Sequence, residues 1–287
     1  MMLAALSADP ARPKQMAATP ALQRARGVAR IEVRAAAGRS RLAALHQAGS
    51  SRIRLPRVSA DAPLEAVLLN TAGGMTGGDH FEIDVAVGRS AAAVVTSQAA
   101  ERVYRRSQGT ARVETRLSVS GGGRLFWLPQ ETIIFNRSAM ARTLTAVVEE
   151  DATLLAFEAV VLGRTAMGER LTDVVMSDAW RIRRGSRLVF ADTTRLEGDA
   201  ASMMNGRATG GGAIAFATLV LVAPDAEARV DVLRAALDDM PGEAGVSGFD
   251  GLLVARMIAG SGQVLRALAI RAVTTLRGVP MPRVWNL

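Results

Sequence analysis

The sequence predicts an all-β fold that ends in two C-terminal α-helices, and three observations favour it. From residue 27 to residue 222, apolar runs of five to nine residues are separated by turns that contain glycine. No helical periodicity alternates with these runs, which argues against a doubly wound parallel sheet. Helical spacing of apolar residues occurs only in two late segments. We therefore expect many short strands, followed by the helices.

The strands are predicted from alternating or short apolar runs. In the clearest case, Phe81 to Val87, apolar residues alternate with Glu82 and Asp84. A hairpin is expected around the turn Arg183 to Ser186. The expected strands are 28–33, 81–87, 113–119, 144–148, 154–157, 180–182 and 188–190.

Each expected helix has its own boundary signals. The first begins at Asp225, which follows Pro224 as an N-cap, and ends before Pro241. Its apolar residues at helical spacing are Val230, Leu233 and Leu237. The second begins near Ser261 and ends at Gly278. Its apolar face consists of Val264, Leu265, Leu268, Ala272, Val273 and Leu276.

Composition favours one domain. The 287 residues are 49% hydrophobic, which permits a large core, and we find no linker and no internal repeat at a solenoid period. We predict a single domain at 27–287, β-rich over 27–222 and helical over 223–287. Residues 1–26 are rich in Ala, Arg and Pro and lack a signal-peptide core, so we expect a disordered tail.

Cysteine and charge exclude several function classes. The chain has no cysteine, which excludes disulfides and thiolate metal sites and favours the cytoplasm. The net charge of +8 raises nucleic acid as a partner, but Lys14 is the only lysine and aromatic residues are 4%, too few for a stacking platform. The longest apolar stretches are far shorter than the roughly 20 residues of a membrane span. We expect neither a nucleic-acid nor a membrane partner.

Two neighbouring strand ends carry oxygen-bearing side chains. Four glycines, at 73, 74, 77 and 78, allow positive φ angles and close chain approach, and they lead to Asp79 at the start of a strand. The apolar run 92–95 ends in another polar cluster, which comprises Thr96, Ser97, Gln98 and Glu101.

Known catalytic motifs are absent from the sequence. It has two histidines, His46 and His80, and lacks phosphate-binding, nucleophile-elbow and metalloprotease motifs. His46 is expected to be a surface or half-buried polar residue, and His80 alone makes a poor site for a borderline metal ion, which prefers several nitrogen ligands. We predict a protein that is not an enzyme. A hydrolase in which Asp79, His80 and Ser97 converge is kept as an alternative.

Five carboxylates lie in apolar or glycine-rich runs: Asp79, Glu101, Glu131, Glu158 and Glu169. The simplest interpretation is that they pair with the abundant arginines. Glu131 and Glu158 are expected to be buried, which is costly unless they are paired, protonated or hydrated. A water-filled passage lined by such oxygens would bind a divalent ion weakly and in succession, which suits transfer.

The ordered motifs resemble the UreD (UreH) family of urease accessory proteins over some 260 residues. Besides the two polar clusters, they are Leu-Pro-Arg at 55–57, Trp-Leu-Pro-Gln-Glu-Thr-Ile-Ile-Phe at 127–135, Leu-Gly-Arg-x-x-x-Gly-Glu at 162–169 and Pro-Arg-x-Trp at 282–285. Asn136 departs from the acidic residue expected there, and Ser97 from threonine. The resemblance implies many strands in a β-helical arrangement with a helical C-terminal part.

The resemblance also implies a function. UreD proteins act as chaperones of urease maturation with UreF and the GTPase UreG, dock on the urease apoprotein and are thought to conduct Ni²⁺ transiently. On this basis the candidate passage residues are Asp79, Thr96, Gln98, Glu131, Glu158 and Glu169. The candidate structural residues are Gly73, Gly74, Gly77, Gly78, Tyr104, Arg105 and Arg164. The main alternative is a scaffold that only bridges UreF to urease. Residues 223–287 either dock UreF or serve only as packing elements, and the sequence leaves both open.

Overall fold

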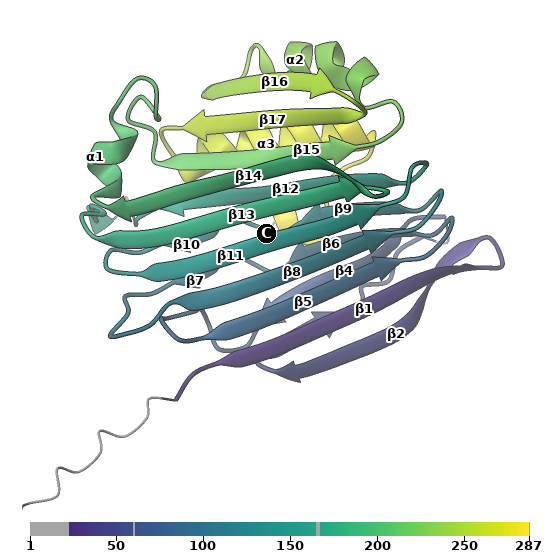
Figure 1. The fold of residues 1–287 in the computed structure, drawn as a ribbon, viewed down its shortest axis with the longest axis horizontal. Helices are drawn as coiled ribbons and strands as arrows, with labels where there is room; N and C mark the ends of the chain where they lie inside the picture. The colour runs from purple at the N-terminus through teal and green to yellow at the C-terminus, as the bar shows by residue number, and fades with distance from the viewer. Residues whose placement is uncertain (1–22, 60, 165–166, 287) are drawn as a thin grey trace, which may run out of the picture.

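The structure is a computed structural model that describes residues 23–59, 61–164 and 167–286. Its strands form two sheets, called sheet A and sheet B here (Figure 1). Sheet A comprises, in spatial order, β14 (Arg187–Gly198), β13 (Val174–Arg184), β11 (Ala139–Val148), β8 (Ala111–Val119), β5 (His80–Val87), β1 (Arg26–Ala36) and β2 (Arg39–Gly49). Sheet B comprises β16 (Glu243–Phe249), β17 (Leu252–Ala259), β15 (Ala215–Val222), β12 (Thr153–Leu162), β9 (Arg124–Leu128), β6 (Ala92–Ser97), β4 (Leu64–Asn70) and β3 (Ser51–Arg54). In addition, β10 (Thr132–Ile134) pairs with β12, and β7 (Glu101–Val103) pairs with β10.

The chain winds as a β-solenoid. After β4 it alternates between the sheets, so that β5, β8 and β11 lie in sheet A and β6, β9 and β12 lie in sheet B. Strands of successive solenoid coils pair in parallel: Leu64 pairs with Ala93 and His80 with Arg112, about 30 residues further on. The opposite sheet therefore provides the crossover that helices provide in a doubly wound fold. This arrangement confirms the expected β-rich, β-helical fold.

All seven predicted strands are confirmed, and most extend further than predicted. Strand β12, predicted to end at Phe157, continues to Leu162 because Glu158 lies inside the strand and is paired there. Strand β1 begins at Arg26, and the Ala25 amide donates to the Asp79 carboxylate. Residues 23–26 therefore belong to the described fold, unlike the tail expected at 1–26, and residues 1–22 lie outside the described part of the chain.

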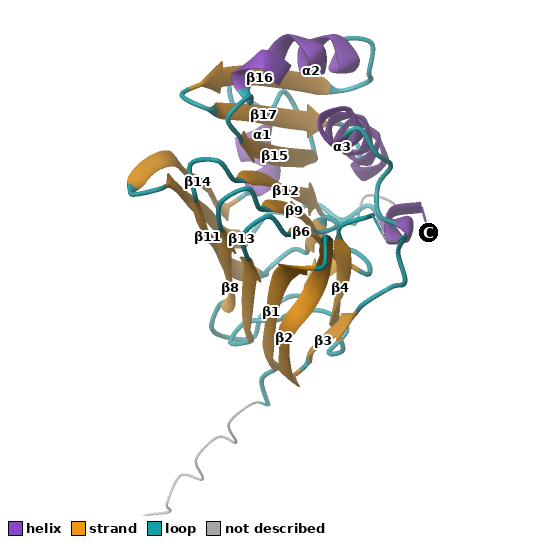
Figure 2. Ribbon diagram, turned by 90° about the vertical axis from the view of Figure 1, so that its right-hand side faces the viewer, coloured by secondary structure: helices purple, strands orange, loops and turns teal. Residues whose placement is uncertain are grey.

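The helices lie on the face of sheet B that points away from sheet A (Figure 2). They are α2 (Val230–Leu237) and α3 (Gly262–Arg277), with the 3₁₀ turns η2 (Glu227–Arg229) and η3 (Arg283–Asn286). Ser261 caps α3 by accepting from the Val264 amide, and Gly278 ends it with φ 69°. Both expected helices are thus confirmed.

Some details of the C-terminal part differ from prediction. Asp225 is not an N-cap, because its carboxylate accepts from the Arg229 side chain and η2 precedes α2. Residues 223–287 are not purely helical, since β16 and β17 extend sheet B there. The short helix α1 (Ala200–Met204), capped by Asp199, was not predicted. Too few residues form α1 for helical periodicity to be visible.

Three apolar clusters make up the core. One lies between sheet B and the helices, and it includes Phe157 and Trp285. The other two lie between sheets A and B, around Trp127 and around Met140. Among the described residues, no helix has the length and apolar character needed to span a membrane.

Candidate functional site

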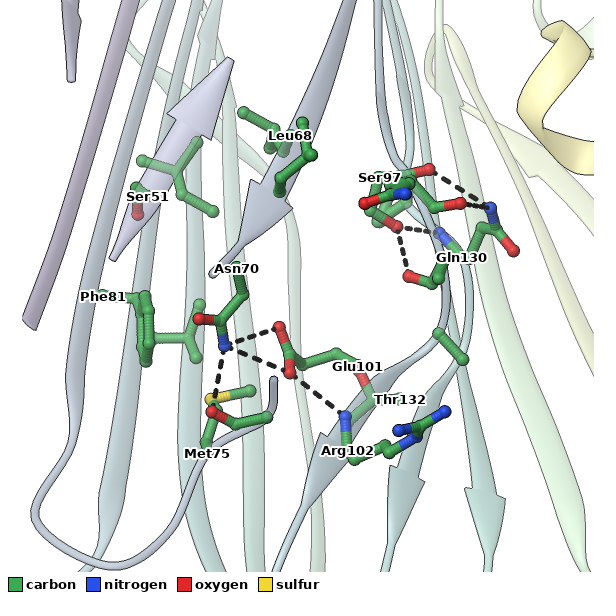
Figure 3. Close-up of a pocket in the computed structure, with 18 of the residues that line it drawn as sticks. Ser51, Leu68, Asn70, Met75, Phe81, Ser97, Glu101, Arg102, Gln130 and Thr132 are labelled. Atoms are coloured by element: carbon green, nitrogen blue, oxygen red, sulfur yellow. Dashed lines mark hydrogen bonds between the residues drawn. The ribbon is translucent and has the colours of Figure 1, made fainter. Parts of the chain in front are cut away.

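A cavity of about 250 Å³ lies between the two sheets (Figure 3). It separates the two inter-sheet clusters, since Met140 and Phe81 line it from one cluster and Trp127 and Ala29 from the other. Its rim contains residues at the protein surface, among them Gln98. The cavity is therefore reached from solvent and ends within the core.

The base of the cavity is a layer of buried polar side chains. The Arg142 guanidinium pairs with the carboxylates of both Glu158 and Asp178, with 3.1 Å between Arg142 Nε and Asp178 Oδ1. Trp127 Nε1 donates to Glu158 at 3.0 Å. In the described structure, the buried hydroxyl of Thr115 lines the cavity without a hydrogen-bond partner. The layer thus offers an acidic group and a free hydroxyl to whatever enters.

Two carboxylates share one guanidinium here, so the layer retains a proton readily. Desolvation raises the pKa of Glu158 to about 7; Arg142 opposes this rise and the Asp178 carboxylate adds to it. Desolvation lowers the pKa of Arg142, but the two carboxylates outweigh it and raise that pKa. Near neutral pH, the charge at the base of the cavity therefore depends on whether Glu158 is protonated.

Two hydrogen-bonded groups stand nearer the rim. Asn70 donates to both Glu101 oxygens, at 3.2 and 3.3 Å, and desolvation raises the pKa of Glu101 against this bond. On the other side Gln130 donates to the backbone oxygens of Ser97 and Gln98 (Figure 3). Amide and carboxylate oxygens therefore lie along the way to Glu158.

Asp79 is buried, but it lies outside the cavity lining. Its carboxylate accepts from the backbone amides of Ala25 and Thr76, each at 2.8 Å, so it holds the glycine loop against the start of β1. Gly74 has φ 144°, and a Cβ there would lie 2.3 Å from the Tyr104 ring. Gly73 and Gly78 also have positive φ, and Gly77 packs against the backbone of Gln108.

Thr96 and Glu131 hold the C-terminal segment. Trp285 Nε1 donates to Thr96 Oγ1 at 3.0 Å, and Arg266 pairs with Glu131 at 3.0 Å. The Arg266 guanidinium also lies 4.7 Å from the centre of the Trp285 ring. Both residues therefore have partners away from the cavity.

Glu169 is half-buried and pairs with Arg164 at 2.9 Å. Despite some desolvation, the hydrogen bonds from Arg164 and from the Asn136 amide lower the pKa of Glu169. Tyr104 donates to the Gly73 carbonyl, and the Arg105 carbonyl accepts from Thr76. Of the six predicted passage residues, the structure thus brings Gln98 and Glu158 to one cavity and gives the other four separate partners.

The three residues of the alternative hydrolase do not converge. His80 bonds Glu114 at 3.1 Å, Ser97 bonds the Ala99 carbonyl and the Gln130 amide, and Asp79 bonds backbone amides. His46 is exposed, as expected.

Comparison with known proteins agrees with this architecture. The family model of the UreD urease accessory protein matches residues 25–286. The chain belongs to the UreD family. It is 43% identical over 272 residues to the urease accessory protein UreD of Azorhizobium caulinodans, which covers 95% of this chain and 100% of that relative. It is 46% identical over 273 residues to urease accessory protein UreD 2 of Methylorubrum populi, with 93% and 92% covered.

In this UreD-family chain, sequence reasoning missed Arg142, Asp178 and Thr115. Each is a single polar residue in an otherwise apolar inward-facing set, as in Met140-Arg142-Leu144 and Met176-Asp178-Trp180. A single polar residue in the inward-facing set of each of several neighbouring strands could have predicted this buried polar layer. Among the described residues, no group of three or more His, Cys, Asp or Glu side chains is arranged to hold a metal ion.

Proposed function

We propose that this protein is a non-enzymatic chaperone of urease maturation that helps to insert Ni²⁺ into the urease apoprotein. It assembles with UreF and, through UreF, with the GTPase UreG in the cytoplasm. Family membership supports the accessory role. The inter-sheet cavity with Glu158 at its base is the observation that carries the metal role.

Nickel is cargo in this proposal, and the cavity suits brief occupancy. An ion at the rim meets the oxygens of Gln98 and Glu101 before it reaches Glu158. These ligands are few and bind through oxygen, whereas tight nickel binding favours several nitrogen ligands. The lining also contains Arg52, Arg102 and Arg142, which oppose prolonged residence of a cation. Weak binding in succession is the behaviour that transfer requires.

UreF is proposed to dock on the exposed part of 223–287. Val232, Phe249 and Val279 are exposed there, while the buried faces of α2 and α3 pack on sheet B. In the alternative, the protein is a scaffold that bridges UreF to urease and its carboxylates are purely structural. The engagement of Asp79, Thr96, Glu131 and Glu169 in local bonds would suit either possibility.

The deciding experiment compares neutral variants inside and outside the cavity. Glu101→Gln with Glu158→Gln removes the two lining carboxylates, whereas Glu169→Gln removes a half-buried carboxylate outside the cavity as the control. We expect nickel content and urease activity, both per recovered complex, to fall severalfold in the double variant and to stay unchanged in the control. Full activity in an intact double-variant complex would refute the passage. Activity that falls only as complex recovery falls would favour the scaffold.

A further inference from the structure

The first turn of the solenoid leaves a bare strand edge. Strand β2 ends sheet A, and within the described residues it pairs only with β1 (Figures 1 and 2). Most of its residues are exposed. Unpaired backbone N–H and C=O groups along such an edge are a template for another strand.

The two faces of β2 differ in chemistry. Opposite β1, Leu42 pairs with Val33 and Leu45 with Ile31, and both β1 residues point into the core. A bulge at Ala43 brings both leucines to this inner face, where each is 37% exposed. The outer face of β2 carries Arg39, Arg41 and His46, because their β1 partners face outward.

The charge around this edge is unbalanced. Between Glu32 and Asp61 the sequence has no acidic and no aromatic residue. It has six arginines there: Arg34, Arg39, Arg41, Arg52, Arg54 and Arg57. In the described part of the chain none of these six forms a salt bridge, whereas Arg30 of β1 and Arg116 of β8 both pair with Asp84 of β5. A partner that binds here must supply the missing negative charge.

The edge strands β16 and β14 each make a side-chain contact with a neighbouring element. Arg234 of α2 donates to the Val246 carbonyl of β16. On β14, Asp192 pairs with Arg256 of sheet B. The β2 edge thus combines free backbone groups, inner leucines and unpaired arginines.

We propose that β2 binds an extended segment of a partner protein in which acidic and apolar residues alternate. Added as the next strand of sheet A, that segment places its apolar side chains beside Leu42 and Leu45 and its carboxylates beside Arg39 and Arg41. Nucleic acid fits less well, because the edge offers leucines and no aromatic side chain for stacking. Residues 1–22 of this chain also fit poorly, since Asp9 is their only acidic residue, beside Arg12 and Lys14. This proposal does not depend on the nickel passage.

The test uses labelled peptides and the full chain. A peptide of alternating Glu and Val is compared by fluorescence anisotropy with a block peptide of the same composition and with an alternating Lys and Val peptide. We expect the alternating Glu peptide to bind at least about tenfold more tightly than either. Hydrogen exchange should show new protection confined to β2.

Variants locate the site. Arg39→Glu with Arg41→Glu should weaken binding of the acidic peptide about tenfold or more, and Leu45→Ser should weaken it with the charge intact. Arg195→Glu with Arg207→Glu, an equal charge change at exposed positions elsewhere, should leave binding unchanged. Circular dichroism verifies folding. The proposal would be overturned if the block peptide bound equally well, or if the control variant lost as much peptide affinity as the β2 variant. Preference for duplex DNA or anionic vesicles, or a homodimer held by β2, would also overturn it.

Discussion

At the residue scale, the main feature is a set of charged side chains buried at the centre of the molecule. Arg142, Glu158 and Asp178 are all less than 10% exposed and lie between two apolar clusters. Removing these three charged side chains from water costs free energy, and the attraction between the guanidinium and the carboxylates only partly offsets that cost. An apolar set of similar volume would often be as stable. The retention of an acidic layer beside a cavity therefore agrees with a role in function.

The raised pKa of Glu158 predicts a pH dependence of stability. The carboxyl has an ordinary pKa of 4.5 and a folded pKa of about 7, so the folded state holds the proton to higher pH than the unfolded state. Its stabilising contribution is therefore full below pH 4.5 and is lost as pH rises through about 7. Relative to Glu158→Gln, which cannot ionise, the wild-type free energy of unfolding should fall by about 1–3 kcal/mol between about pH 5 and pH 8.

Urea denaturation of both proteins across that range measures this difference. Glu169→Gln is the control: the pKa of Glu169 is lowered, so its contribution is present above pH 4.5 and is lost only on acidification. The prediction is contradicted if the difference in free energy of unfolding between wild type and Glu158→Gln stays constant from pH 5 to pH 8. Glu158 would then have the same protonation state in the folded and the unfolded protein.

At the element scale, the C-terminal segment anchors the helices to sheet B. Trp285 is buried, donates to Thr96 of β6 and to the Leu128 carbonyl of β9, and meets Phe157 of β12 edge-on at 6.0 Å between ring centres. Trp285 thus contacts three strands of sheet B.

This anchor predicts a large effect of Trp285→Ala. Removing the buried indole should lower the free energy of unfolding by about 3–5 kcal/mol, because it loses apolar contact and leaves a cavity. Thr96→Val, which keeps the volume and removes the hydrogen bond, should cost about 1–2 kcal/mol. Thermal and urea denaturation provide both values. A loss below about 1 kcal/mol for Trp285→Ala would contradict the anchoring role.

Elements with local signals could be predicted from sequence, whereas their pairing could not. Alternation within 81–87 marks β5, and Ser261 and Gly278 mark the ends of α3. The parallel neighbours of a strand lie about 30 residues away in the sequence. They are joined by backbone hydrogen bonds, which require no repeated side chain and so leave no repeat in the sequence. The site behaves likewise: Glu158 stands out in an apolar run, but its partner Arg142 lies on β11 in sheet A.

At the scale of the whole molecule, the central strands of sheet B contribute to two cores, one between sheet B and the helices and one between the two sheets. Along β12, Leu155 and Phe157 face the helices, while Leu154 and Ala156 face sheet A. Loss of the helices would expose the first pair, and loss of sheet A would expose the second. The two cores are therefore expected to depend on each other, in keeping with the prediction of one domain at 27–287.

That dependence predicts a single unfolding unit. The most protected amides of α3 and of β11 should exchange with the same free energy and the same urea dependence, because each requires the opening of both cores. Native-state hydrogen exchange read by mass spectrometry measures both, and amides of the edge strand β2 provide the weakly protected reference. Unfolding followed by circular dichroism and by tryptophan fluorescence should also coincide, since Trp127 lies between the sheets and Trp285 beneath the helices. If α3 exchanged at a distinctly lower free energy than β11, residues 223–287 would form a separate unit that unfolds before the solenoid.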